Sequence, residues 1–204
     1  FAQDNVALID LRSTPILRVK PHAIETVDGE MECDLIVFAT GFDAGRGGLS
    51  DMNITGANGL SLSQAWKDGL RAYLGMAVSG FPNMLFSYGP LSPSGFSNGP
   101  SSAEVQGDWI CDFLVWMRNN EQDLFEADPA AEAGWTEIVA QAGEMTLFPE
   151  ADSWYMSANI PDNKRQLINF PSLSIYAALC DDVAEKGYHG LAVENISTKE
   201  TTTE

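Results

Sequence analysis

The segment DLIVFATGFDA, residues 34–44, provides the strongest indication of the fold class. Its first part, residues 34–39, is almost wholly apolar, which is typical of a strand buried on both faces of a parallel sheet. Thr40 and Gly41 follow with little side-chain bulk, so a ligand could approach the carboxyl edge of an α/β sheet there. Asp43 could then accept hydrogen bonds from a sugar hydroxyl. Taken alone, the segment fits an ordinary core strand with a glycine turn better, and both interpretations remain open at this point.

Strand and turn patterns continue on both sides of this segment. Residues 16–20 and 23–27 alternate between apolar and polar side chains, and Asp28-Gly29 is a hairpin turn signal. The same kind of pattern predicts further strands at residues 5–11, 73–78 and 84–88. Together with the helices described next, these strands predict an α/β fold.

Three helices are predicted in the second half of the chain. Ser101 and Glu104 have the spacing of a capping box, and a helix with one apolar face follows them as far as Asn120. Asp128 and Pro129 start a second helix, as an N-cap and a proline at the first position. A last helix covers about residues 174–186 and ends at a glycine. The apolar face of the first helix carries Val105, Trp109, Phe113, Trp116 and Met117.

Between the strands and these helices lies the segment GPLSPSGFSNGPSS, residues 89–102, which consists almost entirely of Gly, Pro and Ser. A flexible linker has such a composition. So does a loop whose backbone runs close beside a flat cofactor, because glycine places no Cβ in the way. The lone Phe96 in its middle does not decide between the two.

Composition excludes several classes of function. The net charge is −18 with 11 basic residues, so we expect binding neither to nucleic acid nor to an anionic membrane surface. Hydrophobic residues make up 45% of the 204 residues, which indicates a globular protein, and no apolar run is long enough for a membrane span. The three cysteines lie far apart in apolar contexts, which predicts buried, reduced thiols and a cytoplasmic location. With only His22 and His189, we predict no metal site.

Residues 38–44, FATGFDA, resemble the ATG segment of flavin-dependent monooxygenases, and the Phe-Asp pair within them is typical of Baeyer–Villiger monooxygenases. The resemblance is to the C-terminal portion of these enzymes and extends along nearly the whole chain. It is strongest to the branch that includes the phenylacetone and cyclohexanone monooxygenases. The other segments that carry it, in the order typical of the family, are NVALIDLRSTPI, ITGANGLSLSQAW, YLGMAVSGFPNMLFSYGPLSPSGFSN, GDWICDFL, EAGWTEIV, TLFPEADSWYMSANIP and CDDVAEKGYHGL.

The resemblance implies a Rossmann-like flavoprotein with two dinucleotide-binding domains, of which this chain is a C-terminal fragment. Residues 1–41 would be the tail of the NADP-binding domain. Residues 42–204 would be the C-terminal half of the FAD-binding domain, with residues 195–204 as a disordered tail. Because half a sheet leaves unpaired edges, we expect poor solubility.

The implied reaction uses FAD, NADPH and O2 to convert a small-molecule ketone into an ester or lactone. The glycine-rich pyrophosphate loops of the family are absent from this sequence, and its active-site arginine would lie upstream of Phe1. We therefore assign no catalytic residue within the chain. We expect the fragment to be inactive without the N-terminal portion of the same enzyme, which we expect to be missing.

Site residues are carried over from the family by position. A tryptophan matching Trp154 contacts the nicotinamide nucleotide in relatives, although a core aromatic would look the same in sequence. Relatives often carry a larger apolar side chain at the Gly99 position, which predicts more space or a shifted loop here. The predicted cofactor-binding residues are Ala39, Thr40, Gly41, Asp43, Asn98, Gly99 and Trp154. The predicted substrate-pocket residues are Pro93, Ser94, Gly95 and Phe96.

Two alternatives remain open at the level of sequence. A related flavin monooxygenase could oxidise nitrogen or sulfur instead of a ketone. A truncated, non-catalytic domain that binds a partner would also account for the absence of pyrophosphate loops.

Overall fold

The structure is a computed structural model, and it describes residues 1–93, 97–160 and 163–196. The chain divides into two compact units, Phe1–Gly41 and Phe42–Glu204. Each unit is described by itself below. The assignment of either unit to a particular nucleotide stays a prediction.

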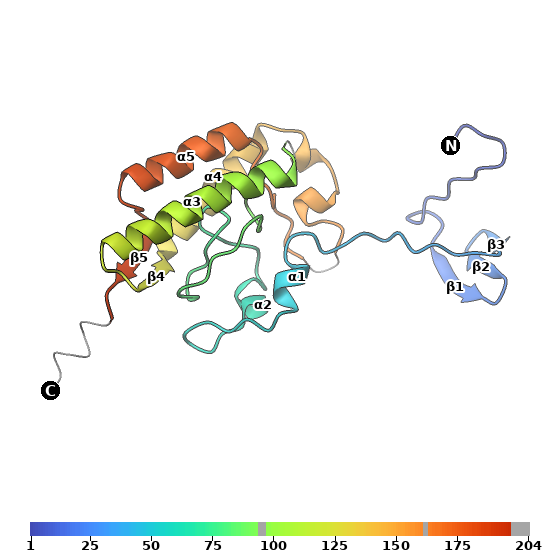
Figure 1. The fold of residues 1–204 in the computed structure, drawn as a ribbon. Helices are drawn as coiled ribbons and strands as arrows, with labels where there is room; N and C mark the ends of the chain where they lie inside the picture. Colours follow the sequence, from blue (N-terminus) through green and yellow to red (C-terminus); the bar gives the residue numbers. More distant parts are fainter. Residues whose placement is uncertain (94–96, 161–162, 197–204) are drawn as a thin grey trace. The chain divides into compact units, whose positions relative to one another are not determined.

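The first unit contains a small antiparallel sheet in the order β1-β2-β3 (Figure 1). Its strands are β1 (Ile16–Lys20), β2 (Ala23–Thr26) and β3 (Gly29–Glu32). The hairpin predicted at Asp28-Gly29 is confirmed, and Gly29 takes a φ of +135° in the turn. This sheet is therefore held together by local hairpins.

Two strands predicted for this unit are not formed. Residues 5–11 and 34–39 have no regular secondary structure, and the side chains of Leu35 and Val37 are 78% and 75% exposed. A parallel strand needs neighbours on its edges to bond its N–H and C=O groups, and no described strand pairs with either segment. The prediction of a buried parallel strand at residues 34–39 is therefore wrong for this structure.

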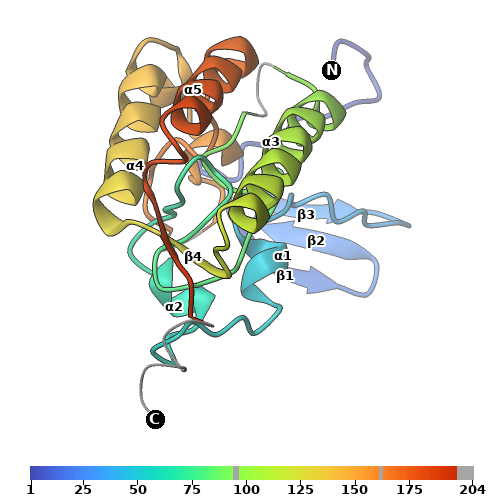
Figure 2. The same ribbon diagram turned by 60° about the vertical axis from the view of Figure 1, so that its left-hand side comes forward.

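The second unit is built on three long helices, of which α5 runs alongside α3 (Figures 1 and 2). The indole nitrogen of Trp109 on α3 donates to the backbone oxygen of Cys180 on α5, at 2.9 Å. The rings of Trp135 on α4 and Tyr176 on α5 lie 5.8 Å apart. The helices are α3 (Gly99–Asn119), α4 (Pro129–Glu144) and α5 (Leu173–Glu185).

These helices agree closely with the sequence patterns that predict them. The N-cap at Asp128 is confirmed, since its side chain accepts from Ala130 and Ala131. The end of α5 is also confirmed, with Gly187 at a φ of +73°. On α3 the predicted apolar face is buried at Trp109, Phe113 and Met117 and partly buried at Val105 and Trp116.

Shorter elements complete the second unit. Strands β4 and β5 pair antiparallel, so the described strands form two antiparallel sheets and no parallel one. Two 3-10 turns lie between α4 and α5. The bounds are α1 (Gly47–Ser50), α2 (Leu62–Ala65), β4 (Leu124–Ala127), η1 (Phe148–Glu150), η2 (Trp154–Met156) and β5 (Leu191–Glu194).

The strands predicted at residues 73–78 and 84–88 are wrong as well, because both segments are irregular. Leu74 and Gly75 take positive φ values of 52° and 67°, which turns the chain back on itself. Tyr73 and Ala77 then face each other across a tight turn. An apolar sequence pattern alone therefore does not identify a strand here.

Two features of the described residues bear on the other predictions. No described helix is both long and apolar enough to cross a bilayer. At the C-terminal end, Asn195 donates to the backbone oxygen of Glu121, and the amide of Ile196 donates to Asp123 at 2.7 Å. The tail predicted to be disordered from residue 195 is thus bonded at its first two positions. Residues 197–204 lie outside the described residues.

Candidate functional site

The Gly/Pro/Ser loop begins as a buried segment that is bonded to the core. The amide of Leu91 donates to the backbone oxygen of Ile168 at 2.7 Å. The amide of Phe170 donates to the backbone oxygen of Ser92 at 3.0 Å. Pro93 pairs with Phe170 in a parallel bridge, and its side chain is fully enclosed by protein atoms. The first part of this loop is therefore fixed, unlike a linker.

Gly75 allows the backbone of Ser92 to lie directly against the chain at residue 75. A Cβ placed on Gly75 would lie 2.7 Å from the backbone nitrogen of Ser92 and 2.9 Å from its Cα. The backbone of Gly75 also has a positive φ of 67°. Any larger residue would push the loop outward.

The near end of the loop is held by a buried polar network. Gln106 on α3 is fully buried, and its Oε1 accepts the amide of Tyr88 at 2.6 Å. The Nε2 of Gln106 donates to the hydroxyl of Tyr176 at 2.8 Å, and that hydroxyl donates to the backbone oxygen of Leu74 at 2.6 Å. Burial raises the pKa of Tyr176, so the hydroxyl stays protonated and can donate. No sequence pattern indicated a role for Gln106 or Tyr88.

The far end of the loop is the start of α3. Asn98 is the N-cap, and its Oδ1 accepts the amide of Ser101 at 2.9 Å. The predicted capping box at Ser101 and Glu104 is therefore wrong, because the helix begins at Gly99, two residues before Ser101. Asn98 is exposed, and its side-chain amide has no acceptor among the described residues. Asn98 can therefore donate to a ligand.

The predicted pocket residues Ser94, Gly95 and Phe96 lie outside the described residues. Gly99 is described, and its missing side chain does not leave open space. A Cβ there would lie 3.3 Å from Cζ of Tyr88 and 3.4 Å from its hydroxyl oxygen. The ring of Tyr88 lies against this position, so the first of the two predicted alternatives, more open space, is not found at Gly99.

Trp154 begins η2 and is 40% exposed. Its ring stacks on that of Tyr155 with centroids 3.8 Å apart, and Tyr155 in turn contacts Phe148. The indole N–H has no partner among the described residues. The turn before it is held by Arg165, which donates to the backbone oxygens of Pro149 and Ala151 at 2.7 and 3.0 Å. Trp154 is thus a supported, half-exposed aromatic and not a core residue.

The remaining predicted cofactor residues are placed as follows. Asp43 forms an ion pair with Arg46 through Oδ2 at 3.2 Å, and Arg46 also bonds to the side chain of Asn163. Oδ1 of Asp43 has no hydrogen-bond partner among the described residues, so it can accept from a sugar hydroxyl. Ala39, Thr40 and Gly41 belong to the first unit and are exposed, with Gly41 at a φ of +88°. Their part in a cofactor site stays a prediction.

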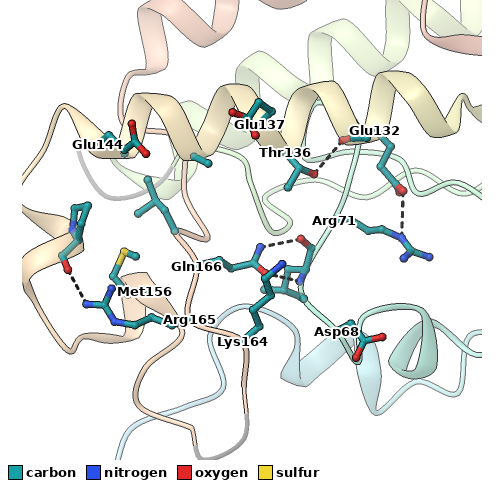
Figure 3. Close-up of a pocket in the computed structure, with 17 residues that line it drawn as sticks. Asp68, Arg71, Glu132, Thr136, Glu137, Glu144, Met156, Lys164, Arg165 and Gln166 are labelled. Atoms are coloured by element: carbon teal, nitrogen blue, oxygen red, sulfur yellow. Dashed lines mark hydrogen bonds and ion pairs between the residues drawn. The ribbon is translucent and has the colours of Figure 1, made fainter.

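A cavity of about 650 Å³ lies beside α4, between this helix and the segments around residues 68–71 and 164–167 (Figure 3). Its floor is held by Gln166, which both donates to and accepts from the backbone of Leu70. At one side Glu132 accepts the amide of Ser79 at 2.9 Å and pairs with Arg71 at 3.2 Å. Burial raises the pKa of Glu132. None of the site residues predicted from the sequence lines this cavity.

No family model matches the chain. It is 46% identical to cyclopentanone 1,2-monooxygenase of Comamonas over 194 residues, which are 95% of this chain and 35% of that enzyme. It is 36% identical to a Baeyer–Villiger monooxygenase of Pseudooceanicola batsensis, over 98% of this chain and 36% of that protein. The chain is related to the Baeyer–Villiger monooxygenases. It spans about a third of the length of the curated relatives it matches.

Solved structures agree with this relationship. A crystal structure described as an OTEMO complex with FAD and NADP matches with a TM-score of 0.85 at 34% identity, over 94% of this chain and 35% of that one. Such structural neighbours have a Rossmann-like fold. The present chain, which aligns with part of that fold, contains both helices and strands. A phenazine N-monooxygenase of Lysobacter antibioticus is also 37% identical over 94% of this chain and 35% of its own length.

Proposed function

We propose that this chain is part of a cytoplasmic Baeyer–Villiger monooxygenase that uses FAD, NADPH and O2 to convert a ketone into an ester or lactone. In this proposal the chain supplies part of the flavin site and of the substrate pocket. The observation that carries it is the match, over 94% of the chain, to a structure with FAD and NADP. A further portion of the same enzyme would supply the pyrophosphate-binding loops and the active-site arginine.

The start of α3 is suited to a flavin. Asn98 satisfies the helix amide of Ser101 with its oxygen and leaves its own amide group for a ring acceptor. The positive end of the helix dipole favours the negative charge of a reduced flavin by about 0.3–1 kcal/mol. A bound FAD would supply the electron transfer from NADPH to O2, and these residues would bind and orient it.

Trp154 is suited to the nicotinamide nucleotide. Its half-exposed ring offers an apolar face, and its indole N–H can donate to a ribose hydroxyl. Tyr155 stacks on the ring, and Arg165 bonds to the backbone oxygens of Pro149 and Ala151 in the preceding turn. Within the proposal, Ala39, Thr40 and Gly41 approach a cofactor with their backbone, and Asp43 accepts from a sugar hydroxyl through Oδ1.

In the same proposal the loop residues Pro93, Ser94, Gly95 and Phe96 form a wall of the ketone pocket. The support is the attachment of the residues just before them, because Leu91 and Ser92 are bonded to Ile168 and Phe170, and a fixed wall orients a substrate better than a mobile one. No acid, base or nucleophile for the reaction is assigned to this chain. We propose no binding to nucleic acid or to membranes.

Product analysis tests the proposal. The full-length enzyme with NADPH, air and cyclopentanone or cyclohexanone should yield the corresponding lactone, identified by mass spectrometry. A phenazine and a thioether serve as competing substrates, because the likeness to the phenazine N-monooxygenase favours nitrogen oxidation as a second candidate. An N-oxide or sulfoxide without any lactone would replace the proposal by that candidate. A colourless, folded and inert protein would point to a non-catalytic binding domain.

A further inference from the structure

One side of α3 is exposed although it carries no charge over most of its length. Ala103, Gly107, Cys111 and Leu114 follow one another at spacings of four, four and three residues, which places them along the same side of the helix. We call these four residues the α3 strip. Cys111 and Leu114 are exposed, and the other two are partly exposed. Because the next charged residue along this side is Arg118, in the last turn of the helix, the α3 strip is an uncharged surface about three turns long.

The α3 strip lies apart from the side of α3 that packs into the core. Trp109, Phe113 and Met117 form that core side and are buried. A Cβ on Gly107 would meet nothing within 4 Å apart from its chain neighbours and the backbone of the helix itself. Glycine weakens the interior of a helix relative to alanine, and no contact among the described residues accounts for it here. The described residues of the second unit therefore leave the α3 strip largely uncovered.

Charge restricts what can cover the α3 strip. The neighbouring side of α3 is acidic, with Glu104, Asp108 and Asp112, and the whole chain has a net charge of −18. A second copy of the chain, an anionic membrane and a nucleic acid would each be repelled. A surface of the same polypeptide needs no charge attraction, because the covalent link keeps it at a high local concentration. The α3 strip therefore suits an apolar surface of its own enzyme better than a separate partner.

The relatives contain enough additional chain to provide such a surface. The present chain covers 35% of cyclopentanone 1,2-monooxygenase, so the larger part of that enzyme lies outside the match. We propose that the α3 strip is an internal packing surface, covered by an apolar surface of the enzyme portion outside residues 1–204. This inference rests on the proposed function only because that function makes this chain part of a longer enzyme.

Thiol labelling of the full-length enzyme tests whether the α3 strip is covered, and peptide mass spectrometry follows each cysteine separately. In the native enzyme Cys111 should react with N-ethylmaleimide about tenfold or more slowly than the thiol introduced by Asp112→Cys, because only Cys111 is shielded. The introduced thiol lies on the acidic side of the same turn of α3 and is followed in a Cys111→Ala background. Equal rates would overturn the proposal.

Cross-linking identifies what covers the α3 strip. Photo-leucine is incorporated in place of leucine in the full-length enzyme, which is then irradiated. The peptide that contains Leu114 should become joined to a peptide from outside residues 1–204 of the same molecule. A product of twice the enzyme's mass, joined through Leu114, would mean that a second copy covers the strip and would overturn the proposal.

Two neighbouring substitutions test what the covered surface contributes to stability. Leu114 and Val115 are 49% and 44% exposed in this chain, but Val115 lies in line with Glu104 and Asp108 and not on the α3 strip. In the full-length enzyme, Leu114→Asp should lower the melting temperature by about 5 °C or more, because a carboxylate would be buried without a partner. Val115→Asp should lower it by less than about 2 °C. Equal shifts for the two variants would contradict the proposal.

The proposed function and the role of the α3 strip fail in different ways. Ketone oxidation by an enzyme in which Cys111 and the thiol of Asp112→Cys react equally fast would overturn the role of the α3 strip and leave the proposed function standing. A shielded Cys111 in a full-length protein that oxidises no ketone would overturn the proposed function and leave the packing surface standing.

Discussion

At the scale of single residues, Gln106 joins three parts of the second unit through one buried amide. We predict that Gln106→Ala lowers the free energy of unfolding by about 2–3 kcal/mol, because the amide of Tyr88 loses its buried partner. Urea denaturation measures the change. The matched control is Gln141→Ala on the exposed face of α4, where the expected change is under about 0.5 kcal/mol. Equal losses in both variants would show that the buried network contributes nothing special.

Cys180 gives a pH-dependent signature. Burial raises the pKa of its thiol to about 12, while the thiol of the unfolded chain ionises near pH 9. The folded state therefore holds its proton longer, and stability that is complete below pH 9 is lost as the pH rises towards 12. The loss from this one group is up to about 1.4 kcal/mol per pH unit.

Denaturation midpoints between pH 8 and pH 11 measure this loss, and Cys180→Ala should flatten the decline. The control is Cys111→Ala, because Cys111 is exposed, contrary to the sequence prediction that all three thiols are buried. An identical alkaline decline in Cys180→Ala and the parent protein would contradict the assignment to Cys180.

At the scale of secondary-structure elements, the start of α3 separates two capping assignments. The structure has Asn98 as the N-cap, and the sequence pattern predicts Ser101. Asn98→Ala should therefore cost about 1 kcal/mol of stability, whereas Ser101→Ala should cost less than about 0.5 kcal/mol. Thermal unfolding of the two variants provides the measurement. A larger loss for Ser101→Ala would move the helix start to the position that the sequence pattern predicts.

The helices could be predicted because their signals are local. The period of the apolar face, the Asp128-Pro129 start and Gly187 after α5 all lie within a few turns of the structure they specify. The sequence predicts a strand at residues 34–39 that does not form, because a strand depends on partners elsewhere in the chain, and a local pattern does not show whether they are present. The burial of the loop at Leu91 depends in the same way on Ile168, which lies far along the sequence.

The candidate site was predicted by resemblance and not by local pattern. Within the part of the chain that the structure describes, Asn98 and Trp154 have donor groups without a partner and exposed surface, which suit the roles carried over to them. Position 99 shows the limit of this approach. The absence of a side chain predicts more space or a shifted loop, and the ring of Tyr88 lies where the space was expected.

At the scale of the whole molecule, exposed apolar residues in the first unit are the main liability. Leu35, Val37 and Phe38 follow one another closely in an irregular segment, and all three are largely exposed. We predict that the isolated chain binds a fluorescent dye for apolar surfaces. Replacing all three by serine should reduce the dye signal without lowering the melting temperature, since exposed side chains contribute little packing. An undiminished signal would place the exposed apolar surface elsewhere.

The central claim is that the start of α3 lies beside a flavin, and the most direct test is the midpoint potential of that flavin in Asn98→Asp. Aspartate keeps the N-cap but adds a negative charge. Asn119→Asp adds the same charge at the other end of α3, roughly 30 Å away. We predict that Asn98→Asp makes the potential of the bound flavin more negative, on the order of 50 mV, and that Asn119→Asp leaves it unchanged. Equal potentials in the two variants, or a full-length protein that carries no flavin, would contradict the account.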